Sequence, residues 1–130
     1  MTKVKLRCGT VELLDIKTIL MTYRNDHHIT LEDVMEIDSA VDTLIPDGDF
    51  YSVLTLQRSF LDISSEAQKM MAHTSPLVPR LKGAAVILNN LPSRLIIGFF
   101  IKRFKPIYPT KIVKNMSEAQ IWIQSQKSLN

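Results

Sequence analysis

Residues 50–56 read Phe50-Tyr-Ser-Val-Leu-Thr-Leu56, and this stretch decides how the rest of the chain is interpreted. It is almost continuously apolar or β-branched, and it lies between Asp49 and the polar pair Gln57-Arg58. Such a composition favours a β-strand. A strand without polar alternation is typical of the centre of a sheet that is covered on both faces. The sequence therefore predicts a buried central strand over residues 50–56.

The chain before this strand predicts a hairpin and a helix. Residues 11–14 and 18–24 are predicted strands, joined by a turn over 15–17. Thr30 and Asp33 have the spacing of a capping box, so a helix is expected to begin there. Apolar residues at 31, 34, 37, 41, 44 and 45 form one buried face. Four acids are expected on the opposite, exposed side of this helix, and they are Glu32, Asp33, Glu36 and Asp42.

The chain after residue 56 alternates helices and strands. A short helix is expected from Ser64 to about Met71, followed by a loop marked by Pro76 and Pro79. Residues 83–88 and 110–113 are predicted strands. Helices are expected from about residue 91 to Phe104, with Asn89-Asn90 supplying the N-cap, and from Asn115 to about residue 126.

This order, β-β-α-β-α-β-α-β-α, predicts an α/β fold. Strands that alternate with helices imply right-handed crossovers and a largely parallel sheet. The leading hairpin would add an antiparallel strand, so we expect a mixed, mostly parallel sheet of about five strands with packed helices. The length of 130 residues suits a single domain over 1–130, with an ordered core over about 10–126.

Composition indicates a globular protein, with 45% hydrophobic and 22% charged residues. The longest apolar run, residues 95–101, is far shorter than a membrane-spanning helix, and no apolar stretch of a signal peptide follows the charged N-terminus. The single cysteine, Cys8, excludes an internal disulfide and every multi-cysteine metal site. A cytoplasmic location, no cofactor and no metal are the corresponding predictions.

Charge is distributed unevenly along the chain. Residues 1–74 carry 7 Lys/Arg and 12 Asp/Glu, a net −5, whereas residues 75–130 carry 9 and 1, a net +8. Such asymmetry can mark a partner or an anionic surface, although folding can also bring the two halves together. Basic and aromatic residues alternate too little to predict nucleic-acid binding.

Catalytic motifs are absent from the sequence. The four glycines are isolated, and neither a Gly-x-Ser-x-Gly nor a His-Glu-x-x-His motif occurs. His27 and His28 are adjacent and have no third ligand nearby in sequence, so solvated loop histidines are the simpler interpretation. The sequence predicts no enzyme and no catalytic residue, and it leaves open a site that is assembled only by folding.

The expected helix over residues 91–104 is unusual because apolar residues cover most of its circumference. A helix that lies on one face of a sheet keeps a polar stripe. The surplus apolar surface is expected to meet a second protomer, a lipid tail or neighbouring loops. Four cations flank it and could hold a phosphate or carboxylate group, and they are Arg94, Lys102, Arg103 and Lys105.

Four stretches of the chain resemble the small SpoIIAA-like domains of bacteria, which are grouped with STAS and SEC14-type folds. They are Ile29-Thr-Leu-Glu-Asp33, Asp62-Ile-Ser-Ser-Glu-Ala67, Leu91-Pro-Ser-Arg-Leu95 with Gly98-Phe-Phe100, and Phe104-Lys-Pro106 with Pro109-Thr-Lys111. The likeness spans most of the chain from about residue 10.

The resemblance implies a non-enzymatic switch. Many STAS domains are phosphorylated on a serine where the helix after the third strand begins, by a kinase that is also their partner. Ser64 stands at the matching position and Ser65 follows, where the family has a glycine. A phosphate at a helix N-terminus is favoured by the exposed N–H groups, although Glu66 would repel it. A simple N-cap role also explains Ser64.

Two functions follow as predictions. The first is a regulatory or protein-interaction module that resembles anti-sigma-factor antagonists and acts through a protein partner, with a homodimer as the expected assembly. The alternative is a binder of an apolar, anionic small molecule, such as a lipid or fatty acid, beside the helix over 91–104.

Overall fold

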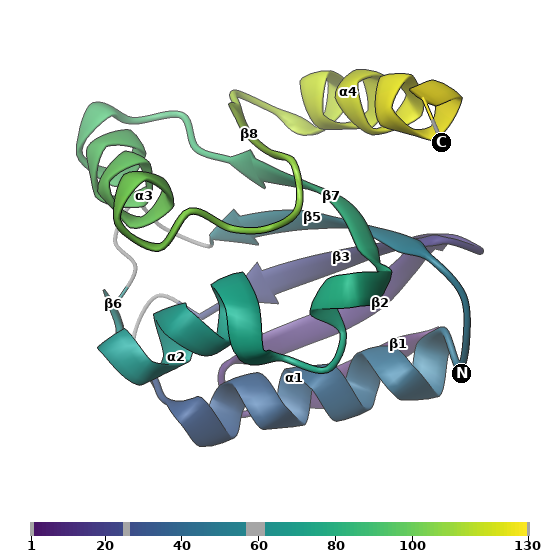
Figure 1. The fold of residues 1–130 in the computed structure, drawn as a ribbon, viewed down its shortest axis with the longest axis horizontal. Coiled ribbons are helices and arrows are strands. Elements are labelled where there is room, and N and C mark those ends of the chain that lie inside the picture. The colour runs from purple at the N-terminus through teal and green to yellow at the C-terminus, as the bar shows by residue number, and fades with distance from the viewer. Residues whose placement is uncertain (1, 25–26, 57–61, 130) are drawn as a thin grey trace.

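The main element of the computed structural model, which describes residues 2–24, 27–56 and 62–129, is a six-stranded mixed sheet (Figure 1). Its strands in spatial order are β1 (Lys3–Leu6), β2 (Gly9–Asp15), β3 (Thr18–Tyr23), β5 (Phe50–Leu56), β7 (Leu81–Ile87) and β8 (Thr110–Val113). The first three strands pair antiparallel, and β3, β5, β7 and β8 pair parallel. The predicted α/β class and the mixed, mostly parallel sheet are confirmed.

The helices cover both faces of this sheet. They are α1 (Leu31–Leu44), α2 (Ser65–Lys69), α3 (Leu91–Phe104) and α4 (Met116–Leu129), with a π-helical turn η1 (Met70–Thr74) and a 3-10 turn η2 (Val78–Arg80). Figure 1 shows α4 alone on one side of the sheet and α1 and α2 on the other. Two short strands, β4 (His28–Ile29) and β6 (Asp62–Ile63), pair parallel beside α2.

Alternation along β5 explains how one strand serves both faces. Phe50 and Leu54 belong to the core under α1, whereas Tyr51 and Val53 belong to the core under α4. Successive side chains of a strand point to opposite faces, so a strand between two helical layers has no polar side. Its partners β3 and β7 lie on either side of it. The prediction of a central, doubly covered strand is confirmed.

Side-chain caps begin the helices where the sequence predicts them. The Thr30 hydroxyl accepts from the Asp33 amide, and the Asp33 carboxylate accepts from the Thr30 amide, which completes the capping box of α1. The Asn90 side chain caps α3 by accepting from Ser93 N at 2.9 Å. Ser64 caps α2 in the same way. These bonds satisfy amides that have no partner inside the helix.

Four features differ from the sequence-based predictions. The sequence predicts about five strands in the sheet, and β1 is the additional one, because the four residues Lys3-Val-Lys-Leu6 are too few to predict a strand. The pair β4 and β6 is not predicted either, because strands of two residues have no pattern in the sequence. The helix expected to run to about Met71 is α-helical only to Lys69 and then widens into η1. Asp33, expected on the exposed side of its helix, is only 1% exposed because its carboxylate turns back into the cap.

Helix α3 packs differently from the other long helices. Among the described elements its main packing partner is α2, and only Ser93 and Ile97 are buried within it. It lies near the carboxyl ends of β5 and β7 (Figure 1). The helix therefore leaves space between its inner side and the sheet.

Candidate functional site

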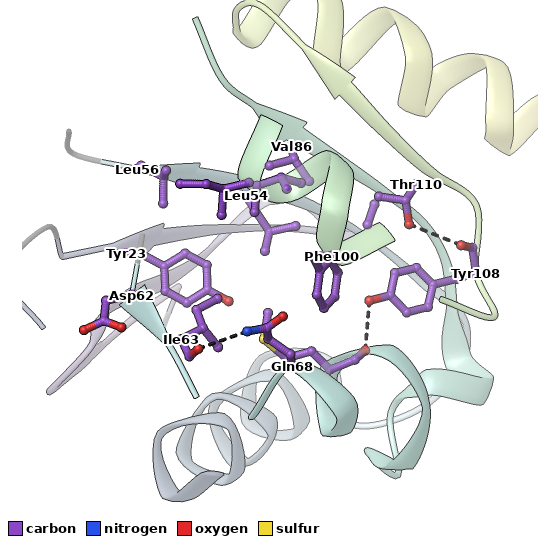
Figure 2. Close-up of a pocket in the computed structure, with 14 residues that line it drawn as sticks. Tyr23, Leu54, Leu56, Asp62, Ile63, Gln68, Val86, Phe100, Tyr108 and Thr110 are labelled. Atoms are coloured by element: carbon purple, nitrogen blue, oxygen red, sulfur yellow. Dashed lines mark hydrogen bonds between the residues drawn. The ribbon is translucent and has the colours of Figure 1, made fainter. Parts of the chain in front are cut away.

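An apolar cavity of about 320 Å³ lies between α3, η1, α2 and the carboxyl ends of the parallel strands (Figure 2). Ile97 and Phe100 of α3 form one wall, and Leu54 and Val86 of the sheet form the opposite wall. The other residues that line it are Tyr23, Leu56, Asp62, Ile63, Gln68, Met71, Ala84, Ile96, Tyr108 and Thr110. Ligands of open α/β sheets commonly bind outside the carboxyl ends of the strands, and small-molecule sites are mostly apolar.

A few polar groups are held in fixed positions on this apolar wall. The Tyr108 hydroxyl donates to the Met71 carbonyl oxygen at 2.8 Å, and Gln68 Nε2 donates to the Ile63 carbonyl oxygen at 3.0 Å. Figure 2 shows both bonds as dashed lines. The π-helical turn places the Met71 carbonyl where Tyr108 reaches it. These bonds tie β6, α2 and the segment before β8 together around the cavity.

A smaller cavity of about 90 Å³ adjoins the first and reaches toward α1. The two share Tyr23, Leu54, Met71, Ala84 and Tyr108 as wall residues. Asp38 and Ser75 line the smaller one, and the Ser75 hydroxyl donates to Asp38 Oδ2 at 2.7 Å. Burial, with the nearby Asp42 charge, raises the pKa of the Asp38 carboxyl to about 6, although the Ser75 bond lowers it.

The raised pKa of Asp38 predicts a pH-dependent stability. A folded-state pKa above the unfolded value means that the folded protein holds this proton more tightly, so this contribution to stability is lost as pH rises from about 4 through 6. Asp38→Asn removes the charge and keeps an oxygen for the Ser75 hydroxyl. We expect the variant to gain about 1–2 kcal/mol relative to wild type at pH 8, after allowance for solvent screening, and little at pH 4.

Urea unfolding of both proteins from pH 4 to pH 8 measures this difference. Asp47→Asn removes one carboxylate charge at an exposed position after α1 and is the matched control. A constant difference between the Asp38→Asn protein and wild type across this range would contradict the prediction.

The two serines predicted as a switch lie where α2 begins. The Ser64 hydroxyl accepts from Ala67 N at 3.1 Å, and the Ser64 amide donates to the Ile29 carbonyl oxygen at 2.9 Å. Its hydroxyl is therefore engaged as the N-cap. Ser65 is the exposed first residue of the helix. Neither serine lines the cavity.

The four predicted cations lie on α3 and at its end, outside both cavities. Arg94 is half-buried in the first half of the helix, and Lys102, Arg103 and Lys105 are exposed around its last turn. Cations in a last turn interact favourably with the helix dipole. The Arg103 guanidinium lies 5.2 Å from the centre of the Phe104 ring. The structure thus does not bring these cations to the apolar cavity.

The outer side of α3 carries an apolar stripe. Leu91, Leu95 and Phe99 are one helical turn apart and are 68%, 54% and 69% exposed. This stripe is the surplus apolar surface that the sequence predicts, and it faces away from the cavity. Exposed apolar stripes of this kind are typical of interaction surfaces.

The histidines turn to separate partners. His27 Nε2 lies 2.8 Å from Asp33 Oδ2, and His28 Nδ1 lies 2.9 Å from Asp62 Oδ2. His73 Nε2 contacts the Phe104 carbonyl oxygen. Across residues 2–24, 27–56 and 62–129, no group of three or more His, Cys, Asp or Glu side chains is arranged to hold a metal ion.

Comparison with known families assigns the chain to one of them. The sequence profile of a family described as a domain of unknown function, DUF7793, matches residues 14–127. The chain belongs to the DUF7793 family. No curated protein and no solved structure was found to match the chain.

The DUF7793 match contains the whole cavity, since every residue that lines it lies between Tyr23 and Thr110. The cavity thus lies entirely within the residues that match the family, whereas β1 lies outside them. In the part of the chain that the structure describes, no helix has the length and hydropathy needed to cross a membrane.

Sequence reasoning pointed to the helix beside the cavity but missed the side chains within it. Tyr23 and Asp38 were not singled out, because nothing in their sequence neighbourhood marks them. One signal was available: Tyr23, Leu56 and Val86 stand at or near the ends of predicted parallel strands, and such ends gather at one edge of a sheet.

Proposed function

We propose that this protein binds a mainly apolar small molecule in the cavity between α3 and the sheet. The observation that carries the proposal is the cavity itself, of about 320 Å³, with apolar walls from strands of the sheet and from α3. Its volume falls in the range of ligand pockets, about 300–1,000 Å³. For scale, a buried apolar cavity of about 150 Å³ is sufficient for benzene.

Burial of apolar ligand surface supplies the affinity in this proposal. Each square ångström removed from water contributes about 25 cal/mol, before the cost of association is subtracted. The anionic character predicted from the cations of α3 is not part of the proposal, because those cations lie outside the cavity walls.

Filling the cavity tests the proposal. Val86 and Ile87 are adjacent in β7, and Val86 points into the cavity whereas Ile87 packs under α4. Val86→Phe places a ring in the cavity and is expected to weaken binding of naphthalene, followed by its fluorescence, at least tenfold. Ile87→Phe makes the same change in side-chain type on the opposite face, so it should leave naphthalene binding within about twofold of wild type.

Equal binding by wild type and Val86→Phe would place naphthalene elsewhere and defeat the proposal. So would a wild-type protein that binds no naphthalene. Thermal unfolding of both variants shows whether they are folded. Val86→Phe adds volume next to existing space, so we expect it to remain folded.

The regulatory or interaction module, with its resemblance to SpoIIAA-like domains, is the second candidate function. The exposed stripe of Leu91, Leu95 and Phe99 favours it, because an apolar helix face of this kind suits a protein contact. In this proposal the stripe would mediate the homodimer or meet a protein partner, and Ser65 is the exposed serine for a kinase to reach. The two functions use opposite sides of α3 and are compatible.

A further inference from the structure

The Tyr23 hydroxyl is a polar group directed into the cavity. Tyr23 ends β3 and is 2% exposed, and its side chain lines both cavities. In Figure 2 the hydroxyl points into the space between Gln68 and Phe100. Within the described chain, no hydrogen bond joins this hydroxyl to another residue. Burial raises the pKa of Tyr23, so the phenol keeps its proton and is available as a donor.

A hydroxyl that faces an apolar cavity without a protein partner is available to a ligand. Most buried polar groups in folded proteins have a partner, and a ligand that fills the cavity would shut this hydroxyl off from water unless it supplies an acceptor. The other hydroxyls of this wall are already used, since Tyr108 donates to the Met71 carbonyl oxygen and Thr110 donates to the Tyr108 carbonyl oxygen. Tyr23 is therefore the hydroxyl in this wall that an acceptor on a ligand would satisfy.

Charge around the cavity disfavours an anion. The described residues that line the two cavities include the carboxyl groups of Asp62 and Asp38, and they include no lysine, arginine or histidine. Asp62 is half-exposed and paired with His28, and Asp38 lies deeper beside Ser75. A carboxylate or phosphate buried there would lose its hydration without gaining a cation, which costs far more than burying a neutral group.

We infer that the ligand is an uncharged, mainly apolar molecule with a hydroxyl or carbonyl group that accepts a hydrogen bond from Tyr23. This inference rests on the proposed function, and it names the ligand class and the residue that selects it. A hydroxyl suits the site well, because it can accept from Tyr23 and donate to a free lone pair on the Tyr108 hydroxyl or on the Gln68 amide oxygen. The apolar walls bind the remainder of the molecule.

Four probes with one ring system separate the possibilities: naphthalene, 2-naphthol, 2-naphthoate and 2-naphthylmethylamine. Their dissociation constants are measured at pH 7 by fluorescence titration against the full chain. We expect 2-naphthol to bind roughly three- to tenfold more tightly than naphthalene, the value of one net hydrogen bond. The anion 2-naphthoate should bind at least tenfold more weakly than 2-naphthol.

Tyr23→Phe removes only the hydroxyl and should abolish the advantage of 2-naphthol over naphthalene. Tyr51→Phe is the matched control, because Tyr51 is equally buried but faces α4 on the other side of the sheet. It should preserve the advantage of 2-naphthol.

The outcomes distinguish the inference from the proposed function. If naphthalene binds and the hydroxyl adds nothing, or if Tyr23→Phe keeps the full preference for 2-naphthol, the cavity binds apolar molecules but the inference is wrong. Tighter binding of 2-naphthoate or of 2-naphthylmethylamine than of 2-naphthol would also overturn the inference. If none of the four probes binds, both statements fail.

Discussion

Replacing Gly9 with alanine is expected to lower the free energy of unfolding by about 3 kcal/mol or more. Gly9 has φ +153°, and a Cβ atom built on it would lie 1.9 Å from the carbonyl oxygen of Thr22. Gly9 pairs with Tyr23 across β2 and β3, so this oxygen belongs to the backbone of the neighbouring strand. The backbone of a hydrogen-bonded strand cannot move aside to relieve this clash, whereas the end of a flexible side chain could. The strands must separate locally, and the melting temperature should fall by roughly 10 °C or more.

Two other glycines provide matched controls for this substitution. Gly48 has φ +83° but nothing within 4 Å of its Cβ position, so Gly48→Ala should cost only the strain of that conformation, about 1 kcal/mol. Gly98 lies inside α3 with free space around it, and Gly98→Ala should be neutral or stabilising by up to about 1 kcal/mol. We expect the loss of stability, measured by thermal unfolding, to be largest for Gly9→Ala, smaller for Gly48→Ala and smallest for Gly98→Ala. This order separates the effect of a steric clash from that of backbone strain. A mild Gly9→Ala variant would mean that β2 and β3 can shift apart.

The elements that the sequence predicts well are those with local physical signals. The strand over residues 50–56, the capping pair Thr30 and Asp33, and the Asn90 cap are all encoded within a few neighbouring residues. Propensity and capping act over that range. The strand β1 was missed because its four residues gain stability from pairing with β2, and that pairing is not visible in the short sequence Lys3-Val-Lys-Leu6.

The cavity depends on distances between elements, which no local pattern specifies. The sequence shows that the helix over 91–104 has more apolar surface than one contact can bury. Its inner side lines the cavity, and its outer side carries the exposed stripe of Leu91, Leu95 and Phe99. What the sequence could not show is the space left between α3 and the sheet. Tyr23 acquires its place in the wall from the register of β3 with β5, which pairs it with Leu56.

The cations of α3 illustrate the same limit. Arg94, Lys102, Arg103 and Lys105 flank the apolar stretch in sequence, which suggested an anionic ligand. In the folded chain the residues of the cavity wall come from strands and helices far apart in sequence, and the charged ones are Asp62 and Asp38. We therefore infer an uncharged ligand, because the side chains that folding places in the cavity wall determine which ligand charge the cavity favours.

Removing the Asp33 carboxylate is expected to destabilise the protein by about 2–4 kcal/mol. Asp33 is 1% exposed, and its Oδ2 accepts from Thr30 N at 2.9 Å and lies 2.8 Å from His27 Nε2. Its Oδ1 lies 3.5 Å from the guanidinium of Arg7. Burial opposes the charge, but the Thr30 and His27 hydrogen bonds outweigh it and lower the pKa of Asp33. Asp33→Ala loses the carboxylate half of the capping box and leaves the Thr30 amide and the His27 ring without their partner, and each loss costs about 1–2 kcal/mol.

Two companion variants separate the cap from the charge in this prediction. Asp33→Asn keeps an oxygen for the Thr30 amide but removes the charge. Its free energy of unfolding, measured with urea at pH 7, should therefore lie between those of wild type and Asp33→Ala. Glu32→Ala removes an exposed acid from the same first turn and should cost less than about 1 kcal/mol, the value of a charge near the helix dipole. Because a lowered pKa stabilises the folded state only while the carboxylate is charged, the contribution of Asp33 is lost as pH falls through its folded pKa. If Asp33→Ala and Glu32→Ala were equally mild at pH 7, the capping box would not stabilise α1.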